Sequence, residues 1–213
     1  MKYKSINSYK TILFDCDGVL INSNKFKYNL FLKYASKILS FNEYSIFIES
    51  KEMNFGISRF KKFQKIFELS NISDRKIQKK IINSFNNEVY EKYLSCDTVN
   101  NLQKIYNKKS NWFVISGSKQ SELRKILKVK KLDKYFKGIY GSPKNKQEIF
   151  NLISTFGIEK PILFIGDSRY DYITAKENKL DFLYVYGWSM KKDLEFFSKI
   201  NQVSKIKSLD ELV

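Results

Sequence analysis

Side chains that could carry out chemistry on a phosphoryl group occur at four separate places in this 213-residue chain. They are Asp15 with Asp17, Ser116, Lys144 with Lys146, and Asp167 with Asp171. Histidine is absent, so carboxylates are the obvious supply of a general acid or base. Four aspartates around one crevice would repel each other unless a hard cation neutralised them, and oxygen-only ligands suit magnesium. With a lysine and a hydroxyl to hold phosphate oxygens, this set indicates attack of a carboxylate on phosphorus.

Each polar group follows, within four residues, a short apolar run that is typical of a buried strand. These runs are TILF (11–14), WFVI (112–115), GIY (138–140) and ILFI (162–165), and FLYV (182–185) completes the series. Strands alternating with helical periodicity predict an α/β fold, a Rossmann-like parallel sheet with helices on both faces. Because the carboxyl ends of such strands face one crevice, the polar groups should converge on a single site.

Residues 22–95 lack this alternation and show helical periodicity instead, for example at Phe60, Phe63, Ile66 and Phe67. Ser73 is expected to cap the helix whose apolar face carries Ile77, Ile81, Phe85 and Val89. We therefore predict a helical domain over residues 22–95, inserted after the first strand. The α/β core is then made of residues 1–21 and 96–213.

Composition limits the classes of protein that need to be considered. Lys and Arg number 39 against 22 Asp and Glu, a formal charge of +17 that attracts anions, either phosphorylated metabolites or nucleic acid. The lysines are scattered, however, which favours a compositional bias over a nucleic-acid face. Two cysteines are too few for a disulfide framework. With no long apolar run and no secretion signal in the sequence, we expect a soluble cytoplasmic protein.

Four phrases in order, DCDGVL (15–20), VISGS (114–118), GSPKNK (141–146) and FIGDSRYD (164–171), resemble the motifs of the haloacid dehalogenase superfamily. The resemblance is to the capped phosphatase branch, similar to phosphoglycolate phosphatase and β-phosphoglucomutase-like proteins. It implies an enzyme, a phosphoric monoester hydrolase, with a helical cap inserted after the first strand of a Rossmann-like core.

By this resemblance, Asp15 is the nucleophile and forms an aspartyl-phosphate intermediate. Asp17 is the general acid and base, which protonates the leaving oxygen and then activates water. Ser116 and the backbone N–H of Gly117 bind phosphate. The acid two residues after the nucleophile argues for phosphoryl transfer over dehalogenation, because only a leaving alkoxide needs a proton.

The resemblance also supplies a lysine and a metal. Lys146 matches the catalytic lysine by its position in GSPxxK, and Lys144 is the competing choice. The implied cofactor is Mg²⁺, with Asp17 contributing its backbone carbonyl. The metal ligands are then Asp15, Asp17, Asp167 and Asp171.

Within the cap, the phrase GISRFKKF (56–63) resembles phrases that place a basic side chain over the active site. Arg59 and Lys62 are therefore candidate substrate contacts, and Arg59 could grip an oxyanion bidentately. A solvated helix face is the alternative interpretation of both residues. Lys25 and Lys27 are weaker candidates near the hinge of the cap.

The predicted function is a magnesium-dependent phosphatase for a small phosphorylated metabolite, with a sugar phosphate as first choice and phosphoglycolate as second. One alternative is a phosphomutase similar to β-phosphoglucomutase, although such mutases generally carry a histidine near the cap hinge and this chain has none. Another alternative is a basic nucleic-acid-binding protein whose catalytic site is inactive, or a phosphatase that acts on the ends of nucleic acids. We expect a monomer or a small homo-oligomer and no membrane association.

Overall fold

A six-stranded parallel sheet forms the centre of the molecule in the computed structural model, which describes residues 3–53, 56–200 and 202–213. The strand order is β3-β2-β1-β4-β5-β6, so the order reverses beside β1. The strands are β1 (Thr11–Phe14), β2 (Asn111–Lys119), β3 (Gly138–Ser142), β4 (Ile162–Gly166), β5 (Asp181–Val185) and β6 (Ser204–Ile206). The prediction of a parallel α/β sheet is confirmed. The edge strand β6 was not predicted, because its sequence SKI carries no apolar pattern.

Both faces of this sheet are buried, since consecutive residues of β1 belong to different apolar clusters. Ile12 and Phe14 lie in one cluster and Leu13 lies in the other. Helices therefore cover both faces, as expected for a parallel sheet. The helices of the core are α5 (Leu102–Ile105), α6 (Gln120–Val129), α7 (Lys146–Ser154), α8 (Arg169–Glu177) and α9 (Lys191–Ser198). In the part of the chain that the structure describes, four short 3₁₀ turns complete the fold, at Ile6–Ser8, Lys51–Met53, Asp133–Tyr135 and Leu209–Leu212.

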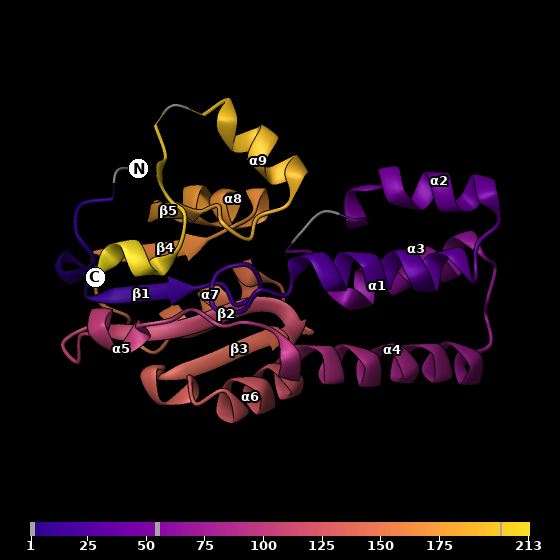
Figure 1. The fold of residues 1–213 in the computed structure, drawn as a ribbon, viewed down its shortest axis with the longest axis horizontal. Coiled ribbons are helices and arrows are strands. Elements are labelled where there is room, and N and C mark those ends of the chain that lie inside the picture. Colours follow the sequence, from indigo (N-terminus) through magenta and orange to yellow (C-terminus); the bar gives the residue numbers. More distant parts are fainter. Residues whose placement is uncertain (1–2, 54–55, 201) are drawn as a thin grey trace.

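The cap, which we define as residues 22–95, lies to one side of the sheet (Figure 1). Its helices are α1 (Asn24–Ser36), α2 (Phe41–Glu49), α3 (Arg59–Leu69) and α4 (Arg75–Ser95). Phe63 of α3 packs against α1 and α4, with its ring 5.8 Å from that of Phe31 and 4.9 Å from that of Phe85. The prediction for the start of α4 was wrong by one residue, because Asp74 and not Ser73 accepts hydrogen bonds from the first backbone N–H groups. The exact domain boundaries stay a prediction.

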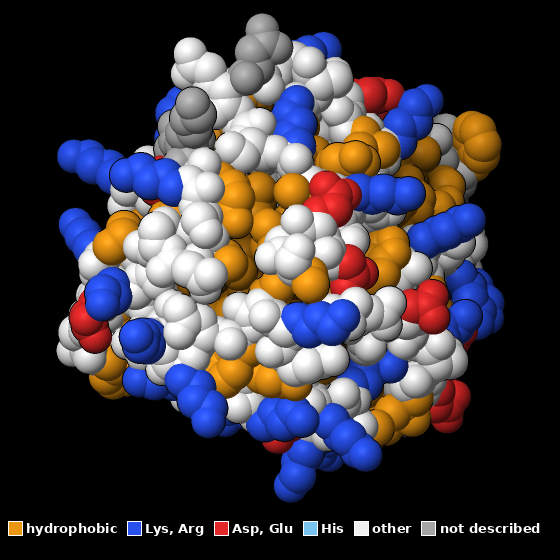
Figure 2. Space-filling model, turned by 60° about the vertical axis from the view of Figure 1, so that its left-hand side comes forward, with side chains coloured by type: hydrophobic (Ala, Val, Ile, Leu, Met, Phe, Trp, Pro, Cys, Tyr) orange, Lys and Arg blue, Asp and Glu red, His pale blue; other side chains and the backbone are white. Residues whose placement is uncertain are grey.

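The distribution of basic side chains on the surface bears on whether the net charge of +17 reflects a nucleic-acid-binding face or a compositional bias. Lys and Arg side chains are spread around the face in Figure 2 and alternate with acidic, polar and apolar groups. Along the described residues, no helix has both the length and the apolar character needed to span a bilayer.

Candidate functional site

Three aspartates gather at the carboxyl end of the sheet, where the strand order reverses. Asp15 directly follows β1, Asp167 directly follows β4, and Asp171 lies in the first turn of α8. All three are at least 96% buried, and one oxygen of each lies within 4.8 Å of one oxygen of the others. Parallel pairing of β1 with β4 fixes this proximity, because it aligns the ends of the two strands.

Lys146 is the lysine that joins this cluster. Its side chain is fully buried, with Nζ 3.0 Å from Asp15 Oδ1 and in an ion pair with Asp171. Lys144 is exposed. A capping box between Asn145 and Glu148 starts α7 at Lys146 and so directs this side chain toward the sheet. Burial alone would lower the pKa of Lys146, but the two carboxylates raise it, so the ammonium form is retained.

The cluster carries more negative charge than one ammonium can balance. Burial raises the pKa of Asp15 to about 7 even though Lys146 opposes the shift. Burial and the Asp15 carboxylate likewise raise the pKa of Asp167. The Asp15 Oδ1 atom is buried and lies 3.0 Å from Lys146 Nζ, which also pairs with Asp171. Three carboxylates with oxygen donors this close together fit a hard divalent cation such as Mg²⁺.

Gly18 permits the close approach of the loop after β1 to this cluster. Its φ is +82°, and an added Cβ would lie 2.2 Å from Asp167 Oδ2. Asn24, the first residue of α1, donates to Asp167 Oδ2 at 2.6 Å and to the Trp188 carbonyl at 3.0 Å. Asn24 was not predicted, because a helix N-terminus gives no sequence signal for a partner 143 residues away.

The Asp17 carboxylate turns away from the cluster and toward the hinge of the cap. It accepts from Lys27 at 2.5 Å, from Ser118 at 2.7 Å, and from the Ser23 and Tyr93 hydroxyls. Burial would raise the pKa of Asp17, but the Lys27 ammonium and these hydrogen bonds hold it well below its usual range. Tyr93 and Ser118 were missed by sequence reasoning, although Ser118 is part of the VISGS phrase.

The two residues predicted to bind phosphate lie at the end of β2. Ser116 is fully buried, and its Oγ accepts from the Ser118 backbone N–H at 3.1 Å. Gly117 lines the cavity described below. A Cβ on Gly117 would lie 2.6 Å from the Gly56 carbonyl oxygen, so the cap rests directly on this loop. The cap thus closes over the site.

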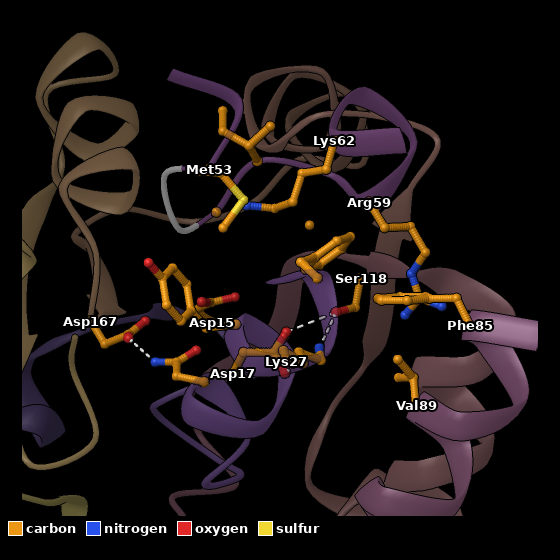
Figure 3. A pocket seen from close by; sticks show the side chains of 16 residues that line it. Asp15, Asp17, Lys27, Met53, Arg59, Lys62, Phe85, Val89, Ser118 and Asp167 are labelled. Atoms are coloured by element: carbon orange, nitrogen blue, oxygen red, sulfur yellow. Dashed lines mark hydrogen bonds and ion pairs between the residues drawn. The ribbon is translucent and has the colours of Figure 1, made fainter. Parts of the chain in front are cut away.

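A small cavity of about 60 Å³ remains between the cap and the carboxylates. Asp15, Asp17 and Asp167 lie on one side of it, and Lys62 reaches down from α3 on the other, beside Met53 (Figure 3). Lys62 is buried, and this burial, assisted by the nearby Lys27 charge, lowers its pKa to about 7. The predicted position of Lys62 over the site agrees with the structure, and its contact with substrate stays a prediction.

Arg59 lines the same cavity, but its guanidinium is already engaged. It forms a bidentate pair with Glu122 at the start of α6 and donates to Asn86 Oδ1 at 2.6 Å. In this arrangement of the cap, the buried Glu122 carboxylate of the core accepts from both terminal nitrogens of the guanidinium. The expected bidentate contact of Arg59 with a substrate oxyanion stays a prediction. The pair joins α3 of the cap to α6 of the core.

This buried pair should matter to stability. We expect Glu122→Gln to lower the free energy of unfolding by about 3 kcal/mol, because it leaves the buried Arg59 guanidinium without a counter-charge. Urea denaturation followed by circular dichroism measures the change. Glu88→Gln is the matched control, since it breaks the exposed Lys33–Glu88 pair within the cap and should leave the midpoint near that of the wild type. Equal shifts in the two variants would refute the structural role of the Arg59–Glu122 pair.

Comparison with known proteins places this arrangement in a family. The model of haloacid dehalogenase-like hydrolases matches residues 12–185, which span the three-aspartate cluster, Lys146 and the cap. The chain belongs to the haloacid dehalogenase-like hydrolase family. No match was found among curated proteins.

Solved structures share the fold over nearly the whole chain. A "predicted phosphatase" from Clostridium acetobutylicum is 20% identical, with a TM-score of 0.66 and 96% of each chain covered. A haloacid dehalogenase-like family hydrolase from Streptococcus pneumoniae is 17% identical, with a TM-score of 0.62, covering 97% of this chain and 98% of that one. A "predicted phosphoglycolate phosphatase" from Haemophilus somnus is 18% identical, with a TM-score of 0.59, covering 83% and 85%. At these identities the likeness establishes the fold.

Proposed function

We propose that this protein is a magnesium-dependent phosphatase that hydrolyses a phosphorylated metabolite through an aspartyl-phosphate on Asp15. The observation that supports it best is the buried Asp15 carboxylate beside Lys146, at the base of a cavity closed by the cap. Similarity to structures described as phosphatases supports it further.

Asp15, Asp167 and Asp171 would hold the cation through side-chain oxygens, and Asp17 through its backbone carbonyl. When bound, Mg²⁺ would offset the mutual repulsion of the carboxylates and stabilise negative charge on the phosphoryl oxygens. Lys146 would stabilise the same charge from within the protein. Its ion pairs with Asp15 and Asp171 keep the ammonium in place without substrate.

The reaction divides into two displacements at phosphorus. An Asp15 oxygen attacks phosphorus, an O–P bond forms, and the bond to the leaving oxygen breaks while Asp17 donates a proton to that oxygen. Asp17 must first separate from Lys27 and take up that proton, because Lys27 lowers its pKa in the closed arrangement of the cap. Water then attacks the same phosphorus and gives its proton to Asp17. The Asp15–phosphate bond breaks, which releases inorganic phosphate and restores the carboxylate. Ser116 and the Gly117 N–H would hold the phosphoryl oxygens in both steps.

A phosphate-release screen over phosphorylated metabolites, with sugar phosphates and phosphoglycolate included, tests this function. We expect stoichiometric free phosphate from at least one ester with Mg²⁺, and a loss of at least about 100-fold in excess chelator, because the carboxylates then lack their counter-charge. A mutase would instead convert a sugar phosphate with little free phosphate. Binding of DNA or RNA with steep salt dependence and no turnover of any ester would favour the nucleic-acid alternative.

A further inference from the structure

The cavity over Asp15 is too small to hold a whole substrate. One water needs about 10–15 Å³ by the same measure, so about 60 Å³ accommodates roughly four or five water-sized groups. That is about the size of a phosphoryl group. A second and larger cleft, of about 680 Å³, lies between the 3₁₀ turn Lys51–Met53 of the cap and helices α8 and α9 of the core. Its volume falls in the range of ordinary small-molecule sites.

The two spaces are neighbours with a common wall. Tyr28, Met53 and Ile57 line both of them. An ester whose phosphate lies over Asp15 therefore has one large space available for its other end, on the far side of these three side chains. Met53 stands at this wall and has a flexible, unbranched side chain that adapts to a neighbouring group.

We propose that this larger cleft receives the leaving group of the ester, and that the leaving group carries an anionic group of its own. The inference rests on the proposed phosphatase function and narrows its substrate class. It adds a second anion subsite that is distinct from Lys146, Ser116 and the cap residues Arg59 and Lys62.

Charge in the cleft supports an anionic ligand. Four cationic side chains line it, Lys51, Arg169, Lys191 and Lys192, and all four are exposed. Asp193 also lines the cleft, but its carboxylate is buried and already accepts from the Arg169 backbone N–H at 2.7 Å. Lys191 has only a loose pairing with Glu195, at 3.8 Å between two largely exposed groups. These cations are thus able to meet a second phosphate without breaking a buried interaction.

Aromatic surfaces in the same cleft indicate a ring next to that anion. Tyr28, Tyr170 and Phe196 line it together with the cations. The Arg169 guanidinium lies 4.9 Å from the Phe196 ring centroid, which positions its charge over an aromatic face. Sugar and nucleoside rings both stack on such faces. The ligand chemistry is therefore a ring that bears two phosphates, one over Asp15 and one in the cleft.

Two pairs of compounds test whether the ring belongs to a sugar or to a nucleoside. Fructose 1,6-bisphosphate is compared with fructose 6-phosphate, and adenosine 3′,5′-bisphosphate with adenosine 5′-monophosphate, each by kcat/KM with Mg²⁺. We expect the bisphosphate to be preferred in at least one pair. Lys191→Ala/Lys192→Ala should reduce that preference about fivefold to tenfold, because it removes two of the four cations.

Lys79→Ala/Lys80→Ala is the matched control, because it removes two adjacent, exposed lysines of α4 that do not line the cleft. It lowers the net charge by the same amount and should leave the preference unchanged. The preferred pair identifies the ring as sugar or nucleoside. Equal effects of the two double variants, or no preference for either bisphosphate, would overturn the second subsite.

Calorimetric binding of both bisphosphates to Asp15→Asn protein in chelator separates this inference from the phosphatase itself. If the wild type hydrolyses no ester, the proposed function fails. A Kd weakened at least fivefold by the Lys191/Lys192 change alone would then still support the subsite. An unchanged Kd, or no binding, would overturn it.

Discussion

Asp15→Asn is expected to reduce phosphate release by about four orders of magnitude or more, because it replaces the attacking carboxylate with a neutral amide. The same change removes one of the three oxygen donors proposed for Mg²⁺. The fold should persist, since the amide is isosteric and avoids the cost of burying a charge, the main cause that raises the Asp15 pKa to about 7. Steady-state release of phosphate, together with thermal unfolding of both proteins, measures these effects.

A direct observation of the intermediate makes this test specific. Wild-type protein quenched in acid after incubation with a ³²P-labelled ester should carry labile phosphate that hydroxylamine removes, and the variant should carry none. Asp181→Asn is the control. Asp181 is the first residue of β5, at the amino end of the sheet and away from the site, and it accepts from the Tyr9 hydroxyl at 3.0 Å. Near-normal turnover in Asp15→Asn would exclude the proposed mechanism.

The parts of the site that follow strands could be predicted from the sequence. Each of Asp15, Ser116 and Asp167 follows a short apolar run within two residues, and parallel pairing brings the ends of those runs together. Lys146 could be chosen over Lys144 only by resemblance, because both lie in one loop. The structure separates them through the helix start at Lys146, which buries one side chain and leaves the other exposed.

The contacts between the cap and the core could not be predicted. Tyr93 reaches Asp17 from 76 residues away and Glu122 reaches Arg59 from 63 residues away. Both contacts depend on how the helices of the cap rest on the core. Periodicity identifies the buried face of a helix but not its neighbour across a domain boundary. Arg59 was therefore expected to meet substrate, while its actual partner belongs to the core.

Asp17→Asn should have the second largest effect, and its size should depend on the leaving group. Alkyl phosphates leave as strongly basic alkoxides, so loss of the proton donor should lower kcat/KM by about 10²–10⁴-fold. p-Nitrophenyl phosphate leaves as a stable phenolate that needs no proton. Its kcat/KM should fall by less than about tenfold, because kcat/KM reports only the steps up to release of that group.

The hydrolytic half of the reaction gives a second and independent readout of Asp17. Water attacks the aspartyl-phosphate slowly without a base, so the variant should show a stoichiometric burst of nitrophenol followed by slow turnover. Lys27→Met is the informative comparison, since it removes the ammonium 2.5 Å from Asp17 and keeps the acid itself. It should retain turnover of alkyl phosphates well above that of Asp17→Asn. Equal losses on alkyl and aryl esters in Asp17→Asn, without a burst, would show that this carboxylate serves the structure of the hinge and transfers no proton.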